Sequence, residues 1–387
     1  MARPPTTPTA PTIISVDDHL VEPAAMFEGR LPAALAERAP RVVVADDGTE
    51  AWELEGNRHP QIGLNAVVGR PKQEWSMDPA NFSDMRTGCW DPSARLADMD
   101  LDGVWASLNF PSLIAGFAGG TFARLADHDL GRACVRAWND WHLEEWCAAD
   151  PNRFIPLQLP WLHDPEWTAA EVRRNAARGF RALSFLEQPV DMGLPSVHTD
   201  HWDPVLRACE ETGTVIALHC ASSGWSASRS PMAPLELLTT LFPANALVTC
   251  ADWLWSGVPV RFPGLRIVLA ESGIDWVPML INRIDYVMGH SATGLSAWTD
   301  AELSPTDVLR RNFSFGVIDI TNVLELRHHI GVSQIVLESD YPHADSTWPD
   351  SGRLADAGLA ALPAGEADAI RWGNAAALFD WPAPPSA

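Results

Sequence analysis

Two short motifs and one isolated histidine carry side chains that bind divalent metal ions. Asp17 and His19 stand two residues apart in SVDDHLVEP, and His219 ends the apolar run VIALH. Asp340 lies in LESDYPHADSTWP, directly after another apolar run. Two imidazoles and two carboxylates suit one Zn²⁺ ion first, with Mn²⁺ or Fe²⁺ as alternatives. An aspartate–x–histidine pair is common, and a histidine that ends an apolar run usually packs in a core, so the interpretation depends on the fold.

Short apolar runs rich in β-branched residues alternate with helix-like stretches along most of the chain. Such a pattern is typical of a parallel sheet that helices cover on both faces. Eight runs predict an α/β fold, a (β/α)8 TIM barrel, as a single domain over residues 13–380. An open doubly wound sheet is less favoured because no glycine-rich loop follows the first run. The runs are 13–19, 103–109, 154–160, 182–187, 215–221, 266–272, 313–318 and 335–342.

Residues 41–87 do not fit this alternation. RVVVADDGTEAWEL, at 41–54, contains two short runs around Asp47 and Gly48, which is typical of a β-hairpin. We expect an insertion after the first strand that lies over the barrel mouth. The first twelve residues, MARPPTTPTAPT, are rich in proline and threonine and predict a disordered tail.

The ends of the predicted strands carry polar or ionisable side chains at every position except the seventh. In a (β/α)8 barrel these ends meet at the catalytic face. Buried carboxylates and imidazoles are costly there unless they are paired or bound to a metal. We therefore predict that Asp17, His19, His219 and Asp340 together hold one divalent ion. The residues at the strand ends are Asp17, His19, Asn109, Gln158, Glu187, His219, Glu271 and Asp340.

Composition excludes several classes of partner. The formal net charge is −23 and the pI is about 4.8, so the surface repels nucleic acids and anionic membranes. We found no uncharged apolar run of about 18 residues and no apolar region of a secretory signal. Six cysteines without CxxC spacing are typical of reduced thiols. We expect a cytoplasmic enzyme that acts on a small molecule.

Several motifs follow SVDDHLVEP in a specific order. They are RLADMDLDGVWASLNFP, NDWHLEEWCAADPNRFIPLQLP, WDPVLRACEETGTVIALHC, FPGLRIVLAESGIDWVPMLINRID, LESDYPHADSTWP and GNAAALF. Together they resemble the amidohydrolase-related family, in the branch of aminocarboxymuconate-semialdehyde decarboxylase and γ-resorcylate decarboxylase. The resemblance implies a metal-dependent TIM barrel, often dimeric. It maps the family's metal ligands onto Asp17, His19, His219 and Asp340, and its acidic first ligand is similar to that of decarboxylases of hydroxylated aromatic acids.

One position departs from the family pattern. Decarboxylases of this family commonly carry a catalytic histidine at the end of the sixth strand, where this chain has Glu271. A glutamate can transfer protons if burial or neighbouring charge raises its pKa. Its negative charge is unfavourable beside a substrate carboxylate, however, which leaves room for hydrolysis. Glu271 could instead orient a ligand histidine or pair with an arginine.

Four further residues are predicted to contact the substrate. In the family, an arginine at about the position of Arg283 reaches across a dimer interface to a substrate carboxylate; an ion pair with Asp285 or Glu271 is the alternative. His343, three residues after Asp340, could bind substrate or support Asp340. Asn109 and Trp276 complete the set.

Three functions remain open from the sequence. The first is non-oxidative decarboxylation of a small cyclic or aromatic carboxylic acid at a mononuclear metal site, with the metal as Lewis acid. The second is hydrolysis of a lactone, amide or ester by metal-bound water, with Asp340 or Glu271 as base. The third is a non-catalytic barrel, which the complete ligand set disfavours. In the first two, Asp340, Glu271 and His219 form the predicted catalytic group.

Overall fold

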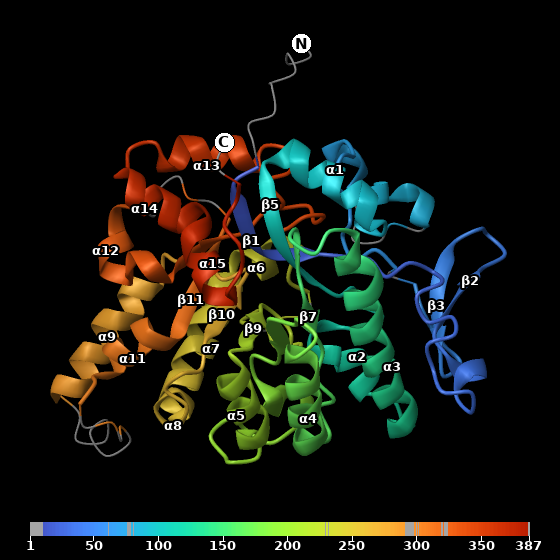
Figure 1. The fold of residues 1–387 in the computed structure, drawn as a ribbon, viewed down its shortest axis with the longest axis horizontal. Helices are drawn as coiled ribbons and strands as arrows, with labels where there is room; N and C mark the ends of the chain where they lie inside the picture. The colour runs from blue at the N-terminus through green and yellow to red at the C-terminus, as the bar shows by residue number, and fades with distance from the viewer. Residues whose placement is uncertain are drawn as a thin grey trace, which may run out of the picture.

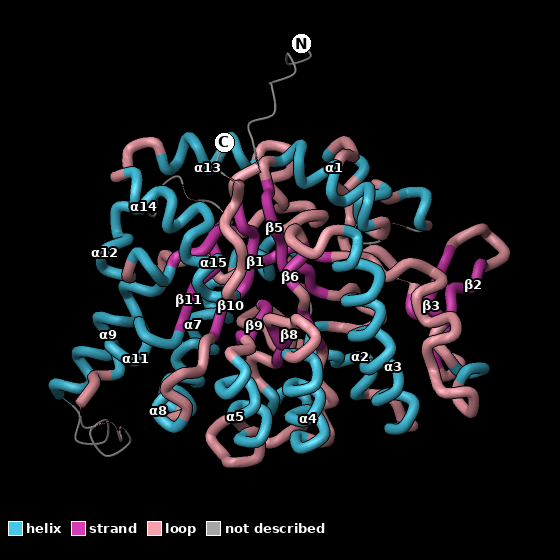
Figure 2. The backbone as a smooth tube through the Cα atoms, in the orientation of Figure 1, coloured by secondary structure: helices cyan, strands magenta, loops and turns pink. Residues whose placement is uncertain are grey.

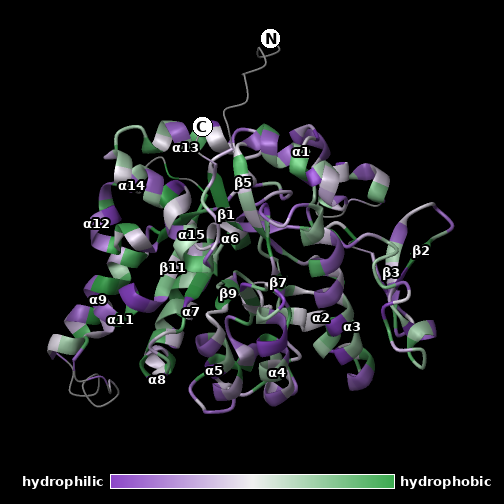
Figure 3. Ribbon diagram, viewed as in Figure 1, coloured by the Kyte–Doolittle hydropathy of each residue, from purple (hydrophilic) through white to green (hydrophobic). Residues whose placement is uncertain are grey.

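The computed structural model describes residues 11–385 apart from 61, 76–78, 80, 229, 231, 291–297, 299, 301, 319 and 321–323. Ten of the twelve residues of the predicted N-terminal tail lie outside the described residues. Strands gather at the centre of the molecule and helices surround them (Figures 1 and 2). The central strands are strongly apolar, whereas purple, hydrophilic positions lie mostly on the outer helices (Figure 3).

The central strands form two parallel sheets. One has the order β1-β5-β6 and the other the order β12-β11-β10-β9-β8-β7. Each of the eight predicted runs overlaps one of these strands, except that 154–160 contains two, so the predicted parallel α/β architecture is confirmed. The strands are β1 (Ile13–His19), β5 (Val104–Phe110), β6 (Phe154–Ile155), β7 (Leu157–Gln158), β8 (Ala182–Phe185), β9 (Val215–His219), β10 (Ile267–Ala270), β11 (Phe313–Val317) and β12 (Ile335–Leu337).

The two sheets adjoin each other at both edges. Only Pro156 separates β6 from β7, and a proline has no N–H to donate to a strand ladder. At the other edge β1 lies beside the end of β12: Asp340 N donates to Asp17 O at 2.9 Å and His19 N donates to Tyr341 O at 2.6 Å. These contacts join the two sheets, although the described strands do not form one uninterrupted ladder.

Helices follow most of the strands and begin at recognisable sequence signals. Asp91, Asp164 and Ser304 each accept a hydrogen bond from a backbone N–H of the first turn, and a proline follows each of them. The longer helices are α1 (Pro92–Asp102), α3 (His128–Trp141), α4 (Pro165–Ala176), α5 (Asp203–Thr212), α7 (Phe242–Trp255), α9 (Val277–His290), α11 (Pro305–Asn312) and α13 (Ser351–Leu359). The shorter ones are α2 (Gly120–Ala123), α6 (Leu235–Thr240), α8 (Val258–Arg261), α12 (Arg327–Ile330), α14 (Ala364–Asp368) and α15 (Asn374–Phe379).

The interior between the sheets is filled by apolar side chains at alternate strand positions. Nearly all of these side chains are completely buried, and α15 closes the cluster at the end away from the carboxyl ends of the strands. The strand residues of this cluster are Ile14, Val16, Ala106, Leu108, Phe110, Ile155, Leu157, Ala182, Val215, Ala217, Val268, Ala270 and Val336. Packing is therefore complete below the strand ends, and polar groups are confined to the rim.

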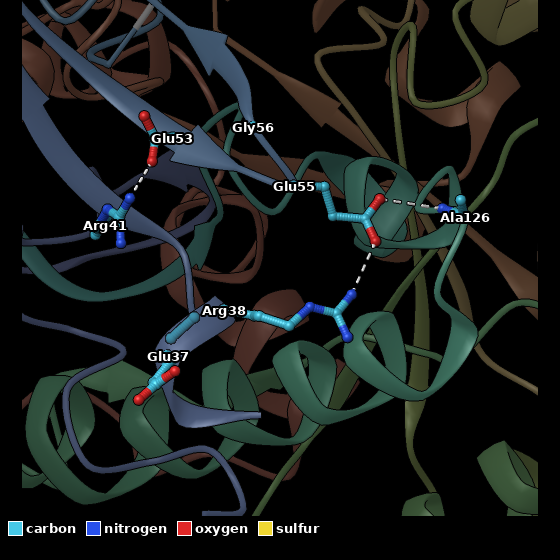
Figure 4. Close-up of a pocket in the computed structure, with 8 residues that line it drawn as sticks. Glu37, Arg38, Arg41, Glu53, Glu55, Gly56 and Ala126 are labelled. Atoms are coloured by element: carbon cyan, nitrogen blue, oxygen red, sulfur yellow. Dashed lines mark hydrogen bonds and ion pairs between the residues drawn. The ribbon is translucent and has the colours of Figure 1, made fainter. Parts of the chain in front are cut away.

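A separate antiparallel sheet forms within residues 41–87. It contains β2 (Arg41–Val44), β3 (Glu50–Leu54) and β4 (Asn57–His59), and β2 pairs with β3 across the turn at Asp47. Figure 1 shows β2 and β3 standing to the side of α3. Hydrogen bonds and ion pairs join this side to the start of α3: Glu55 accepts from Ala126 N at 3.2 Å (Figure 4), and Arg38 pairs with Asp127 at 2.7 Å. That the whole of 41–87 covers a barrel mouth stays a prediction.

None of the helices among the described residues is both long and apolar enough to span a membrane.

Asp102 provides a test of how the end of α1 is joined to α13. Its carboxyl group is buried and accepts from Ser351 N at 2.8 Å and from Ser351 Oγ at 2.7 Å. Burial raises the pKa of Asp102 to about 7, above its ordinary value of 3.8. The folded state therefore holds this proton more tightly than the unfolded chain, and the stability that it contributes is lost as pH rises from about 4 to 7.

We predict that Asp102→Asn removes this pH dependence. The free energy of unfolding of the variant, relative to wild type, should rise by a few kcal/mol between pH 5 and pH 8, at most about 1.4 kcal/mol per pH unit. Urea unfolding of both proteins at the two pH values measures the difference. Glu28→Gln, at an exposed position, controls for the loss of one negative charge. An equal pH dependence in wild type and Asp102→Asn would contradict the assignment.

Candidate active site

The four predicted metal ligands converge at the carboxyl ends of three strands. Nε2 of His19 lies 3.2 Å from Nε2 of His219, 3.2 Å from Oδ1 of Asp340 and 3.4 Å from Oδ1 of Asp17. Nε2 of His219 lies 3.6 Å from Oδ2 of Asp17. All four residues are buried, with exposed fractions of 2% or less. The structure thus places two imidazoles and two carboxylates around one point, as the sequence analysis expected.

A bulge at the end of β1 turns the correct side chains inward. Ser15 pairs with Ser107 and Asp18 with Asn109, so two residues of β1 oppose a single residue of β5. Strict alternation from Ile14 and Val16 would have pointed Asp18, not Asp17, into the interior. With the bulge, Asp17 and His19 enter the site.

Asp18 instead ties β1 to the segment after β12. Its Oδ1 accepts from Ser15 Oγ at 3.0 Å, from Ser339 Oγ at 2.6 Å and from Tyr341 N at 3.3 Å. Burial raises the pKa of Asp18 to about 6. These bonds fix Asp17, one residue before Asp18, in position relative to Asp340, one residue after Ser339.

The two imidazoles face each other through their Nε2 atoms. Nδ1 of His219 lies 2.7 Å from Cys220 O, so this nitrogen carries the proton and donates it, which leaves a lone pair on Nε2. Burial lowers the pKa of His219 to about 4, and burial together with His343 lowers that of His19. If Nε2 of His19 also carries a lone pair, the two nitrogens, 3.2 Å apart, repel each other unless a cation lies between them. Neutral imidazole is the form that binds metals.

The carboxylates also have atoms that a cation would satisfy. Both carboxyl oxygens of Asp17, Oδ2 of Asp340 and Nδ1 of His19 are buried without a hydrogen-bond partner among the described residues, whereas Oδ1 of Asp340 lies 3.0 Å from Nδ1 of His343. Burial opposes ionisation of Asp340, but His343 and His19 hold its pKa below the usual range. Burial and the charges of Glu338 and Asp340 raise the pKa of Asp17. A divalent cation would satisfy these atoms and offset both charges, so the donor set fits such an ion.

Glu271 lies beside this cluster, as expected from its place after β10. Its Oε2 is 3.7 Å from Nε2 of His219, and its backbone N–H donates to Oε2 of Glu338 at 3.2 Å. Burial, then the charges of Asp340 and Asp345, raise the pKa of Glu271 well above its ordinary range. Its φ of 53° is in the left-handed region, which is uncommon for a residue other than glycine. Glu271 is thus held in a conformation that brings its carboxyl group to the imidazole.

Aromatic rings surround the imidazoles, and most of them were not predicted. Phe117, in a short 3₁₀ turn after β5, stacks on His219 with ring centroids 4.1 Å apart, and Phe110 meets the same imidazole edge-on at 4.9 Å. His343, which was predicted, packs against His19 with tilted rings whose centroids are 3.9 Å apart, and it places Nδ1 3.0 Å from Oδ1 of Asp340. The alternation in β5 could have indicated Phe110, because it shares a face with Ala106 and Leu108.

Three predicted substrate contacts do not point into the site. Asn109 faces the opposite side of β5 and accepts from Trp146 Nε1 at 2.9 Å. Trp276 packs on Phe315 at 5.4 Å, and its Nε1 donates to a backbone carbonyl. Side chains alternate along β5, so Asn109 points away from the site when Phe110 points toward it. Trp276 fills the apolar core between α9 and β11.

Arg283 is exposed on α9, and its guanidinium lies 5.1 Å from the ring of Tyr286. It contacts neither Asp285 nor Glu271 through an ion pair found in the described part of the chain. The side chain therefore cannot serve the site of its own chain from this position, and any role at a substrate carboxylate would require a second subunit.

A small enclosed cavity adjoins His19 and His343. It is too narrow to hold a water molecule. Part of its wall comes from residues 63–64, within the predicted insertion at 41–87, whereas the cleft in Figure 4 lies between β2–β4 and the segment before α3. The cavity is lined by His19, Leu20, Val21, Gly63, Leu64, Pro111, Ser112, Pro342 and His343.

Comparisons with known proteins agree with this geometry. The chain is 23% identical over 287 residues to 2-amino-3-carboxymuconate-6-semialdehyde decarboxylase of Dictyostelium discoideum, covering 70% of this chain and 72% of that protein. It is 26% identical over 320 residues to γ-resorcylate decarboxylase of Rhodococcus jostii, covering 75% and 90% respectively.

Two solved structures share the fold. An amidohydrolase from Mycobacterium avium subsp. paratuberculosis has a TM-score of 0.72 at 22% identity, covering 95% of this chain and 99% of that one. A dihydroxybenzoic acid decarboxylase from Polaromonas, solved with bound manganese and the inhibitor 2-nitroresorcinol, has a TM-score of 0.63 at 17% identity, covering 95% and 97%. The amidohydrolase family model matches residues 30–381, nearly the whole chain. This protein is an enzyme and belongs to the amidohydrolase family.

Proposed function

We propose that this enzyme is a metal-dependent decarboxylase of small aromatic carboxylic acids. The observation that carries the proposal is the convergence of Asp17, His19, His219 and Asp340 with carboxyl oxygens that lack hydrogen-bond partners. Both curated relatives are named as decarboxylases, and the Polaromonas decarboxylase holds manganese with an aromatic inhibitor. Zn²⁺ suits two imidazoles and two carboxylates, and Mn²⁺ is the alternative that this similar structure supports.

When bound, the ion would supply a Lewis acid and a template for substrate oxygens. The chain's own residues do the rest. Phe110 and Phe117 exclude water from the imidazoles by covering His219. Glu271, whose carboxyl group is protonated more readily than usual, can give a proton to the ring carbon that loses CO₂. His343 holds Asp340 in its orientation.

The proposal includes three finer points of organisation. The β1–β12 and β6–β7 junctions support closure of the strands into one (β/α)8 barrel. The six cysteines are free and buried, which supports a cytoplasmic location. A row of exposed side chains on α9, at Met279, Arg283 and Tyr286, has helical spacing and supports a homodimer through this helix.

Hydrolysis of a lactone, amide or ester is the second candidate. The specific observation in its favour is Glu271 itself, a carboxyl group 3.7 Å from a ligand imidazole where a base could accept a proton from water. Asp340 is the other candidate base.

We predict that His219→Ala and Asp340→Ala each lose metal. The purified wild type should contain at least one equivalent of a transition metal, and the occupancy of each variant should fall about tenfold or more because a quarter of the donor set is gone. Plasma mass spectrometry measures this. His198→Ala, an exposed histidine paired with Asp252, should keep its metal. A wild type that takes up no metal after reconstitution would contradict the proposal.

We predict CO₂ release from hydroxybenzoates in ¹⁸O-water, without ¹⁸O in the aromatic product. Glu271→Gln should lower the rate by about 10²- to 10⁴-fold because it cannot supply the proton, whereas Glu28→Gln should leave it unchanged. Mass spectrometry of the products decides between the two reactions. Incorporation of ¹⁸O into the product of a small lactone or ester, with no CO₂ from any hydroxybenzoate, would favour the hydrolase.

We predict that wild type is a dimer in solution and that Met279→Glu shifts it toward the monomer, because the substitution places a charge in the proposed interface. Light scattering after size-exclusion chromatography measures the mass. Leu101→Glu, an exposed apolar residue on α1, is the matched control and should remain dimeric. A monomeric wild type would contradict the α9 interface.

A further inference from the structure

We infer that Arg95 is a positioning residue that keeps the metal ligands His19 and Asp340 in place. It acts through the backbone of the first and through the residue that follows the second. The inference rests on the proposed function, because it concerns ligands of the proposed metal ion. Arg95 lies in α1, at the start of the motif RLADMDLDGVWASLNFP, and its side chain is not itself a ligand.

Arg95 is a completely buried arginine, with an exposed fraction of 0%. Its Nη1 atom is buried without a hydrogen-bond partner among the described residues. Arg86, nearby in the chain, pairs with Asp98 at 2.6 Å, whereas no carboxylate forms an ion pair with Arg95 in the described part of the chain. Burying a guanidinium in this way is unfavourable unless its other contacts compensate. Those contacts lead to the metal site.

Two nitrogens of the guanidinium donate to backbone carbonyls. Nη2 donates to His19 O, and Nε donates to Gly88 O at 2.8 Å. The backbone N–H of His19 donates to Tyr341 O at 2.6 Å. Both polar groups of the His19 backbone are thus bound, one by Arg95 and the other by the residue after Asp340. Supporting hydrogen bonds of this kind keep a metal-binding side chain in its geometry.

The face of the guanidinium lies over Tyr341. Its Cζ atom is 4.0 Å from the centroid of the Tyr341 ring and 5.3 Å from that of Trp146. A planar cation over an aromatic face is an attractive arrangement, and it is stronger where water is excluded. Tyr341 directly follows Asp340, and its hydroxyl group donates to Oδ2 of Asp98 at 2.6 Å. One side chain of α1 therefore contacts the polypeptide at both ligands.

Gly88 allows this close arrangement because it has no Cβ. A Cβ at this position would lie 2.3 Å from Oδ2 of Asp98 and 2.7 Å from the hydroxyl oxygen of Tyr341. The turn that contains Gly88 can therefore pack against these two side chains and still present its carbonyl to Nε of Arg95. The guanidinium is thus held by two carbonyls and an aromatic ring, which fixes its position.

Arg95 also places a permanent positive charge close to the carboxylates of β1. Burial raises the pKa of Asp18, which stands between the ligands Asp17 and His19, and the charge of Arg95 opposes this rise. Arg95→Lys would keep the charge but lose the planar fork that reaches two carbonyls and a ring at once. Arg95→Met would lose both. The two substitutions together separate the effect of charge from the effect of geometry.

The test uses Mn²⁺ alone with the full-length protein after chelator treatment. Arg95→Lys and Arg95→Met should each bind Mn²⁺ about tenfold or more weakly than wild type, the loss typical of removing a group that orients a metal ligand. The electron paramagnetic resonance spectrum of the bound Mn²⁺ should also change in both variants, because the ligand geometry changes.

Arg153→Met is the matched control and should bind Mn²⁺ as wild type does. Arg153 is also buried, donates to Val104 O at 3.0 Å and lies 5.0 Å from the centroid of the Trp105 ring. These contacts are at the start of β5, at the opposite end of the strand from the site. The control therefore reports what the loss of a buried, stacked arginine does to stability alone.

Urea unfolding with and without Mn²⁺ provides a second readout. A ligand that binds only the folded state raises the free energy of unfolding, so the increase reports affinity even in a destabilised variant. The increase should be full in Arg153→Met and smaller in both Arg95 variants. Arg95→Lys, which keeps the charge and most of the stem, serves as the folded variant if Arg95→Met unfolds.

The outcomes separate this inference from the proposed function. Wild-type affinity in both Arg95 variants, with stability lowered as in Arg153→Met, would overturn the positioning role and leave the proposed function intact. Wild-type affinity in Arg95→Lys, whatever the result for Arg95→Met, would also overturn it, because charge alone would then suffice. No binding of Mn²⁺ by wild type would overturn both.

Discussion

The contact between the first and last strands is the constraint on which the site depends. The backbone hydrogen bond from Asp340 N to Asp17 O, 2.9 Å long, brings two of the proposed metal ligands from opposite ends of the chain together. Asp18 reinforces it through Ser339 and Tyr341. Below this junction the apolar interior is fully packed, so there is little space for the charged groups to move away from one another. The site is thus a set of like charges held together by the fold.

Burying charged groups in this way is energetically unfavourable, and the neighbouring side chains at the strand ends reduce the penalty. Neutral imidazoles from β1 and β9 alternate with carboxylates, and Phe110 and Phe117 keep water from His219. Burial strengthens every electrostatic interaction in the cluster, which makes it unfavourable as an empty site and favourable as a binding site for cations. The overall charge of −23 has the same sign, so the protein attracts metal ions over a longer range as well.

Glu271, at the carboxyl end of β10, could support two kinds of chemistry. The carboxyl group of Glu271 lies 3.7 Å from the His219 imidazole, so it could give a proton to a ring carbon or accept one from water. Family membership does not decide between these roles, because function depends on the groups at the strand ends rather than on the barrel.

The sequence by itself determined the parallel α/β class and the four side chains that we propose as metal ligands. Apolar runs of strand length that alternate with capped helices leave few alternatives to a parallel α/β fold, and polar residues at the ends of Ile13–His19 and Val215–His219 have few structural explanations. Only the tertiary structure decided which side chains face the site. The bulge in β1 turns Asp17 inward, and alternation in β5 turns Asn109 away and Phe110 in. Such choices depend on strand register, and a shift of one residue reverses every side chain.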